Sequence, residues 1–244
     1  MIVTSSMHPD YRSNAYLVAD EPGGHAVFID AGAPIEPLMS KVEELGVRVT
    51  HVLLTHEHHD HTTFMVALEE RYGATIVLPE NVTAETVIRS GNLRLHAMPT
   101  PGHCTPHVTW VTEDASGAPT AAFTGDAIFK GTVGGTLNGG PDGLALLRDS
   151  IEHHILALPP TTTIYPGHME PTTVAAELET NPFVLAWRGD TTHADDPVTV
   201  AGTDATLLLE AADYDGGTKA WVRFADGNEA IVGGSMVSRP EAHA

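Results

Sequence analysis

In the first part of the chain, short apolar runs typical of strands alternate with segments whose apolar residues have helical spacing. Residues 14–20 (NAYLVAD) and 25–32 (HAVFIDAG) are apolar runs separated by the turn sequence EPGG, which predicts two paired strands. Residues 34–46 have a proline near the start, apolar residues at helical spacing and a glycine at the end, which predicts a helix. The β-branched run VTHVLLT at 49–55 then predicts a buried strand.

The same mixture of elements continues along the chain, as expected for the α/β class. Helices are predicted over 62–73, 143–158 and 172–182, and we expect the third to be the last helix and to stop before Pro182. Further strands are predicted over 74–80, 92–103, 107–114 and 120–129, and residues 162–168 (TTIYPGH) predict a short strand that leads to a turn.

The pattern changes from about Asp196 onward, where helical spacing is rare. Residues 205–237 predict a β-meander with hairpin turns at DGG and DGN. We therefore predict a main domain over residues 1–195 and a small β-meander appendage over 196–244. The appendage would cover a site, mediate self-association into a homo-oligomer, or shield a sheet edge.

Composition limits the classes of partner. The chain has 244 residues, 42% of them hydrophobic, with 12 basic against 32 acidic residues and a formal net charge of −20. Such a charge repels nucleic acid and anionic membranes, so we expect a small-molecule substrate, no nucleic-acid partner and no membrane partner. An acidic surface also keeps a protein soluble, whatever its function.

Cysteine content and the N-terminal sequence indicate the compartment. Cys104 is the single cysteine, so the chain has no internal disulfide of the kind typical of small secreted scaffolds. The N-terminus has no basic segment followed by a long apolar run, and no apolar run approaches the roughly 18 residues of a membrane span. We expect a soluble, cytoplasmic protein.

The sequence THEHHDH at residues 55–61 holds four histidines and two carboxylates, between a predicted buried strand and a predicted helix. Ligands of α/β proteins bind at the carboxyl ends of strands, so the location suits a site. His56 and His58 are one residue apart and can reach one ion. Asp60 and His61 follow as the chain turns into the helix and can hold a second ion nearby.

These four residues are too few for a complete metal site, which needs about four ligands, or three and a water in a catalytic site. Glu57 and His59 lie between them and are expected to face away. Three further candidates stand in turns after predicted strands, each directly preceded by glycine, which allows the backbone to come close to a site. They are His103 in TPGH, Asp126 in TGD and His168 in PGH.

HEHHDH followed by TPGH, TGD and PGH resembles the metallo-β-lactamase superfamily, most closely its glyoxalase II-like branch, from the first strands to about residue 170. The resemblance implies a four-layer αβ/βα sandwich, with metals at one edge between two facing sheets. It implies that Asp30 in FIDAG supports the ligand loop. It also implies a first metal on His56, His58 and His103, a second metal on Asp60, His61 and His168, and Asp126 as the bridge between them.

The chemistry implied is hydrolysis at a dinuclear centre, with Asp60 and Asp126 as the carboxylates at the reacting centre. Two metals about 3.5–4 Å apart share a water and lower its pKa toward about 7, so a bridging hydroxide attacks a thioester, ester or related acyl bond. Nitrogen and oxygen ligands suit two Zn²⁺ ions, and they also suit Fe²⁺ or Mn²⁺.

Two other functions stay open. Persulfide dioxygenases resemble the same branch but use a single iron, whose ligands here would be His58 or His56, together with His103 and Asp126. A metal-binding module without catalysis is the third alternative, although a purely structural site would not need open coordination positions.

The sequence departs from glyoxalase II at residues 130–140, which read KGTVGGTLNGG where those enzymes usually carry GGCGRFFEG. The basic helical C-terminal region that grips glutathione in those enzymes is also replaced by the acidic β-rich tail. Specificity for glutathione thioesters is therefore not expected, although Lys130 could contact an anionic substrate group. His107 is either a residue that supports the ligands or the start of a strand, and Cys104 is expected to be a small buried residue.

Overall fold

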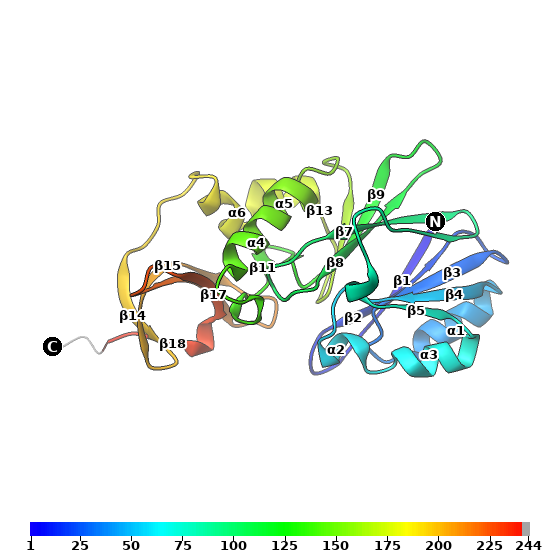
Figure 1. Cartoon of the computed structure of the whole chain (residues 1–244), viewed down its shortest axis with the longest axis horizontal. Helices are drawn as coiled ribbons and strands as arrows, with labels where there is room; N and C mark the ends of the chain where they lie inside the picture. Colours follow the sequence, from blue (N-terminus) through cyan, green and yellow to red (C-terminus); the bar gives the residue numbers. More distant parts are fainter. Residues whose placement is uncertain (241–244) are drawn as a thin grey trace.

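The computed structural model describes residues 1–240. Two β-sheets face each other, with α1 and α3 outside the first sheet and α4, α5 and α6 outside the second (Figure 1). The sheet orders are β1-β2-β3-β4-β5 and β13-β12-β9-β8-β7-β6. This arrangement is the predicted four-layer αβ/βα sandwich, and a third, C-terminal sheet is attached to it.

The first sheet is antiparallel from β1 to β3 and parallel from β3 to β5. The predicted pair of strands and the buried strand that follows the first helix are confirmed as β2, β3 and β4. The strands of this sheet are β1 (Ile2–Met7), β2 (Asn14–Ala19), β3 (His25–Ile29), β4 (Arg48–Leu53) and β5 (Thr75–Val77).

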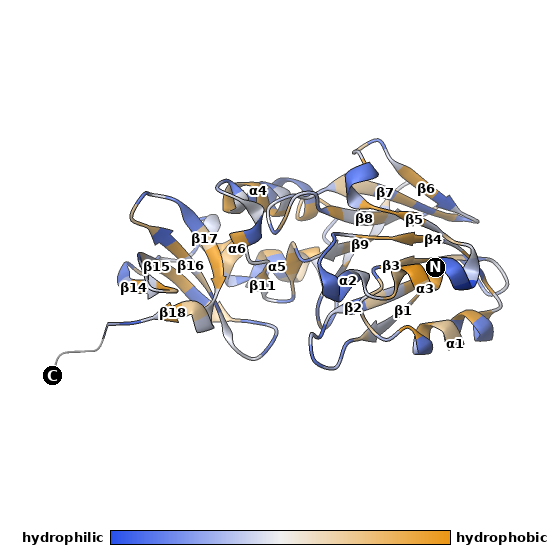
Figure 2. Cartoon of the chain, turned by 60° about the horizontal axis from the view of Figure 1, so that its bottom comes forward, coloured by the Kyte–Doolittle hydropathy of each residue, from blue (hydrophilic) through white to orange (hydrophobic). Residues whose placement is uncertain are grey.

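Two helices cover the outer face of this sheet, α1 (Glu36–Leu45) and α3 (Met65–Tyr72). A proline in the first turn of α1 and Gly46 at its end, with φ of 63°, set its limits as the sequence predicted. Side chains alternate along β3, so Phe28 packs against the helices while Val27 and Ile29 face the second sheet. Figure 2 colours the strands in the middle of the sandwich mostly hydrophobic and the connecting loops mostly hydrophilic.

The second sheet is antiparallel except for the parallel pair β12 and β9. Between β9 and β12 the chain forms a short hairpin, a 3₁₀ turn and a helix that continues as a π-helix. The sheet consists of β6 (Val87–Ser90), β7 (Leu93–Pro99), β8 (Val108–Glu113), β9 (Pro119–Gly125), β12 (Thr163–Pro166) and β13 (Thr172–Thr173). The intervening elements are β10 (Ile128–Phe129), β11 (Thr132–Val133), η2 (Leu137–Gly139), α4 (Gly143–Asp149) and a π-helix, η3 (Ser150–Ile155).

The helix predicted over 172–182 is not the last one. It is α5 (Val174–Thr180), and a further helix, α6 (Pro182–Trp187), begins at the proline. The Asn181 side chain accepts hydrogen bonds from the N–H groups of Phe183 and Val184 at 3.0 and 3.4 Å. Proline needs no partner in a first helical turn, so Pro182 ends one helix and starts the next.

The predicted β-meander is confirmed as the antiparallel C-terminal sheet β17-β16-β15-β14-β18. Leu208, Trp221 and Ile231 of this sheet share one apolar core with α4 and α6. The division at residue 195 into two units stays a prediction. The strands are β14 (Asp196–Val200), β15 (Thr203–Ala212), β16 (Thr218–Phe224), β17 (Glu229–Gly233) and β18 (Val237–Ser238).

No helix in residues 1–240 combines the length and the apolar character needed to cross a membrane.

Candidate metal centre

The seven predicted ligands gather at one edge of the sandwich. Each of the four segments that carry them follows the end of a strand, β4, β7, β9 or β12. The helix α2 (His59–Thr62) begins inside the histidine cluster and turns its members in different directions. The ligand atoms form two groups, His56, His58, His103 and Asp126 in the first and Asp60, His61 and His168 in the second.

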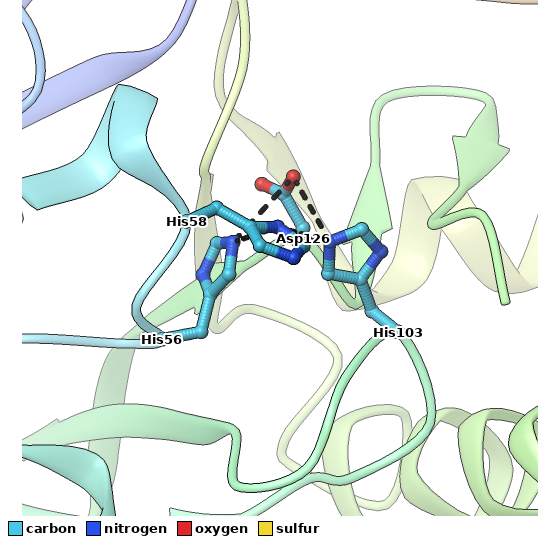
Figure 3. Close-up of side chains that lie close together, drawn as sticks. All are labelled: His56, His58, His103 and Asp126. Atoms are coloured by element: carbon cyan, nitrogen blue, oxygen red, sulfur yellow. Dashed lines mark hydrogen bonds and ion pairs between the residues drawn. The ribbon is translucent and has the colours of Figure 1, made fainter. Parts of the chain in front are cut away.

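In the first group, imidazole nitrogens point at one another and at a carboxylate (Figure 3). Nδ1 of His58 lies 3.0 Å from Nε2 of His56 and 3.0 Å from Nε2 of His103. Oδ2 of Asp126 lies 3.9 Å from Nε2 of His56 and 3.6 Å from Nε2 of His103. Four ligand atoms within 4.8 Å of one another enclose a space of the size that one metal ion needs.

The second group lies on the other side of Asp126. Oδ2 of Asp60 is 3.6 Å from Nε2 of His61 and 3.5 Å from Nε2 of His168. Oδ1 of Asp126 is 3.3 Å from Nε2 of His61, and its Oδ2 is 3.3 Å from Nε2 of His168. One buried carboxylate thus faces ligand atoms of both groups.

The far nitrogens of the histidines are held by the protein. Nδ1 of His103 donates to the carbonyl oxygen of Gly135 at 2.8 Å, and Nδ1 of His168 donates to that of Tyr11 at 3.0 Å. A proton on Nδ1 leaves the lone pair on Nε2, the atom that points into the centre. The two rings are therefore held in the tautomer that a metal ligand requires.

Asp30 supports the loop that carries the histidine cluster, as the resemblance implied. Its carboxylate accepts hydrogen bonds from the backbone N–H and the hydroxyl of Thr55, both at 2.8 Å, and lies 2.9 Å from Nδ1 of His61. Oγ1 of Thr55 in turn lies 3.0 Å from Nδ1 of His56. One buried aspartate thus orients a histidine of the second group directly and one of the first group through Thr55.

Glycines let the ligand turns pack closely. A Cβ atom on Gly167 would lie 2.1 Å from Oδ1 of Asp126, and one on Gly134 would lie 1.9 Å from the Asp126 carbonyl oxygen. A Cβ on Gly32 would lie 1.5 Å from the carbonyl oxygen of Asp60. The sequence indicated close approach at Gly167, whereas Gly32 and Gly134 acquire this role only through contacts across the fold.

Burial and charge set the protonation of the cluster. Burial lowers the pKa of His56 and of His103, which keeps both imidazoles neutral. Burial also opposes the charge on His61, but the carboxylates of Asp126 and Asp30 outweigh it and raise its pKa well above the usual value. Burial would raise the pKa of Asp126, and the facing His168 and His61 instead lower it well below the usual range. Histidine and carboxylate thus neutralise each other where a cation would be bound.

The residues present fit a pair of divalent metal ions. Nε2 of His61 and Oδ1 of Asp126 are buried 3.3 Å apart, and neither makes a well-aligned hydrogen bond within residues 1–240. Buried polar atoms left in this way are costly, and a cation between them would satisfy both. Nitrogen and oxygen donors together are typical of sites for zinc, iron or manganese.

Comparison with known proteins agrees with this geometry. The family model described as the metallo-beta-lactamase superfamily matches residues 8–86, which include Asp30 and the whole histidine cluster. The crystal structure of ETHE1 from Myxococcus xanthus is 31% identical, with a TM-score of 0.65, over 76% of this chain and 85% of that one. The chain belongs to the metallo-beta-lactamase superfamily.

Within the superfamily, the chain belongs to the glyoxalase II-like branch. Hydroxyacylglutathione hydrolase from Bradyrhizobium sp. (strain BTAi1) is 30% identical over 164 residues, covering 63% of this chain and 61% of that enzyme. The chain therefore spans about three fifths of the length of such relatives. A protein crystallised in a di-iron-bound form is 28% identical, with a TM-score of 0.59, over 74% of this chain and 99% of that one.

His107 holds the central aspartate of this superfamily member in place. Its Nε2 accepts a hydrogen bond from the backbone N–H of Asp126 at 3.2 Å, and its Nδ1 lies 2.9 Å from Oγ1 of Thr100. Burial lowers the pKa of His107 to about 3, so the ring stays neutral and keeps this acceptor. Of the two readings of His107, the structure supports the one in which it braces a ligand turn.

Other candidates contribute less. Cys104 is half-buried, and burial raises the pKa of its thiol to about 12, which makes it a poor nucleophile. Lys130 forms an exposed ion pair with Glu170 at 3.0 Å. Sequence reasoning missed Tyr214 of the C-terminal sheet, whose phenol has its pKa raised by burial and then by the charge of Asp126. Nothing in the local pattern around this tyrosine indicates a site.

Proposed function

We propose that the protein is a dinuclear metal-dependent hydrolase that cleaves a thioester, ester or related acyl bond. The observation that carries the proposal is the position of Asp126, whose single carboxylate lies 3.3 Å from His61 and His168 and 3.6 Å from His103. Such a carboxylate serves two metal positions at once. When bound, two divalent ions lower the pKa of water to supply a nucleophile and polarise the carbonyl of the substrate.

The side chains of the chain divide the remaining work. The first position would be held by His56, His58 and His103, the second by Asp60, His61 and His168, with Asp126 shared. The Asp126 side chain is 9% exposed, whereas that of Asp60 is 23% exposed. Asp60 is the more accessible carboxylate. We assign it the role of accepting the proton that the attacking water loses and passing this proton to solvent.

The substrate we propose is a small acyl compound. The net charge of −20 and the sequence at residues 130–140 support neither nucleic acid nor glutathione as a ligand. The single cysteine is consistent with action in the cytoplasm. For the metal we propose Zn²⁺, with Fe²⁺ or Mn²⁺ as alternatives, since the donor set accommodates all three and one relative was crystallised with two irons.

A mononuclear iron persulfide dioxygenase, of the ETHE1 type, is the second candidate. The similarity to ETHE1 at 31% identity supports it. Its iron would use His103, Asp126 and either His56 or His58, which all lie in the first group. Asp60, His61 and His168 would then bind no metal, and their convergence on Asp126 would be unexplained.

The metal content and the substrate panel separate these candidates. Protein purified without added metal is analysed for elements, then assayed on thioesters, lactones and a persulfide with an oxygen electrode. Two metals per chain and acyl hydrolysis without oxygen uptake support the hydrolase. One iron per chain and oxygen uptake with the persulfide would replace it by the dioxygenase, and no turnover of any substrate would refute both.

Asp126→Ala tests the centre itself. We expect loss of metal at both positions and a fall in turnover of at least about a hundredfold, since even residues that only orient ligands cost 10–100-fold. Asp204→Ala is the matched control, because Asp204 is exposed near the start of β15, at the other end of the strand from Tyr214. An Asp126→Ala enzyme with two metals and full turnover would disprove the assignment.

A further inference from the structure

The turn between β15 and β16 extends from the C-terminal sheet toward the sandwich (Figure 1), and it contacts a proposed metal ligand. The Tyr214 ring in this turn stacks on the His168 imidazole, with 4.5 Å between ring centroids and 19° between planes. Phe129 meets both rings edge-on, at 5.5 Å from His168 and 4.9 Å from Tyr214. The rings of Tyr214 and Phe129 therefore pack together beside the second group of ligands.

The turn is fixed by a buried lysine. Lys219, on β16, is 6% exposed, and its Nζ lies 3.3 Å from Oδ1 of Asp213. The same ammonium group lies 5.2 Å from the centroids of the Phe129 and Tyr214 rings, within the range of a cation–π interaction. The Lys219–Asp213 charge pair and the Phe129 ring therefore hold Tyr214 in place.

The loop between β1 and β2 also holds the turn. Nη1 of Arg12 donates to the carbonyl oxygen of Tyr214 at 3.1 Å. Arg12 follows Tyr11, whose own carbonyl oxygen accepts from His168. One loop between β1 and β2 therefore positions both a metal ligand and the tyrosine stacked on it.

We propose that Tyr214 determines specificity, as the wall of an acyl-group subsite beside His168 that favours substrates carrying an aromatic ring. The proposal rests on the proposed function, which brings an acyl group to the centre. Tyr214 is half-buried, and its contacts with His168, Lys219 and Arg12 make it rigid before binding. The ammonium group of Lys219 beside the ring is already paired with Asp213, which disfavours binding of an anionic acyl group to it.

Binding of two simple acids tests the wall without requiring turnover. Protein reconstituted with Zn²⁺ is titrated calorimetrically with phenylacetate and with acetate, which share the carboxylate and differ in the ring. We expect the wild type to prefer phenylacetate by about three- to tenfold, as one aromatic contact provides. Tyr214→Ala should bind both acids about equally, and Tyr214→Phe should keep the preference because it keeps the ring.

Stability and turnover are measured in parallel. Tyr214→Leu keeps apolar volume without an aromatic ring and repeats the test if Tyr214→Ala fails to fold. Equal binding of the acids by the wild type, or a preference that survives in the alanine or leucine variant, would overturn the proposal. Absence of acyl hydrolysis by the wild type would instead overturn the proposed function, while a ring preference lost with Tyr214 would still locate the aromatic wall.

Discussion

Asp30→Asn should weaken the second metal position more than the first. Asparagine has almost the same shape and tolerates the left-handed backbone that Asp30 adopts, with φ of 55°, so the change removes charge without adding backbone strain. Asp30 lies 2.9 Å from Nδ1 of His61 and receives two hydrogen bonds at 2.8 Å from Thr55. The variant thus loses a charge-assisted contact to a proposed ligand and places an amide N–H₂ near buried donors.

The magnitude follows from that contact. A hydrogen bond to a charged group contributes about 1.5–3 kcal/mol, and each 1.4 kcal/mol is a factor of ten, so affinity at the second position should fall about 10–100-fold. The first position contacts Asp30 only through Thr55 and His56, and its loss should be several-fold smaller. Competition with a chromophoric chelator, combined with elemental analysis, measures the two affinities.

Thr55→Val is the matched comparison, because it removes the hydroxyl that lies 3.0 Å from Nδ1 of His56. It should weaken the first position more than the second, which is the reverse of Asp30→Asn. Equal effects of the two variants on both positions would show that the network acts only on folding. Wild-type affinities in Asp30→Asn would show that Asp30 does not tune the ligands at all.

Two further predictions concern Asp126 and its neighbours. The pKa of His61 is higher in the folded protein than in the unfolded chain, where it is about 6.5. Its pairing with Asp126 and Asp30 therefore stabilises the metal-free fold fully below a pH of about 6.5. This stabilisation is lost as the pH rises through the pKa of His61 in the folded protein. A metal ion must displace the proton from His61, so metal affinity should rise with pH. Calorimetry in buffers of different ionisation enthalpy should detect the released proton. A pH-independent metal affinity would contradict the assignment of His61 as a ligand. Gly167→Ala should lower metal content at both positions at least about tenfold, because its Cβ would lie 2.1 Å from Oδ1 of Asp126. Gly135→Ala is the control and should retain metal, because its Cβ would lie 3.6 Å from the carbonyl oxygen of Ile231. Equal metal content in the two variants would refute this steric argument.

Much of the fold was predictable from local patterns. Apolar period, a proline in the first turn of α1 and Gly46 at its end identified β2 to β5 and the two covering helices, since these preferences act within a few residues, whereas β1 was not predicted. Pro182 shows the limit, because the same residue that stops a helix also opens one, and only the Asn181 cap distinguishes the two. The π-helical continuation of α4 likewise had no sequence pattern of its own.

The candidate metal centre was likewise predictable only in part from local sequence. Spacing alone separated His56 and His58 from Asp60 and His61, because backbone geometry decides which side chains of one segment can share an ion. The contact of His107 with the N–H of Asp126 joins residues 19 apart in the sequence. The stacking of Tyr214 on His168 joins two sheets.

Sequence therefore determined which side chains can serve as ligands, since ligand chemistry and local spacing belong to the residues themselves. Tertiary structure decided which ligands meet at Asp126, which groups orient them, and that the C-terminal sheet borders the centre. Those facts depend on packing between distant segments, and the period and spacing of one segment carry no information about another.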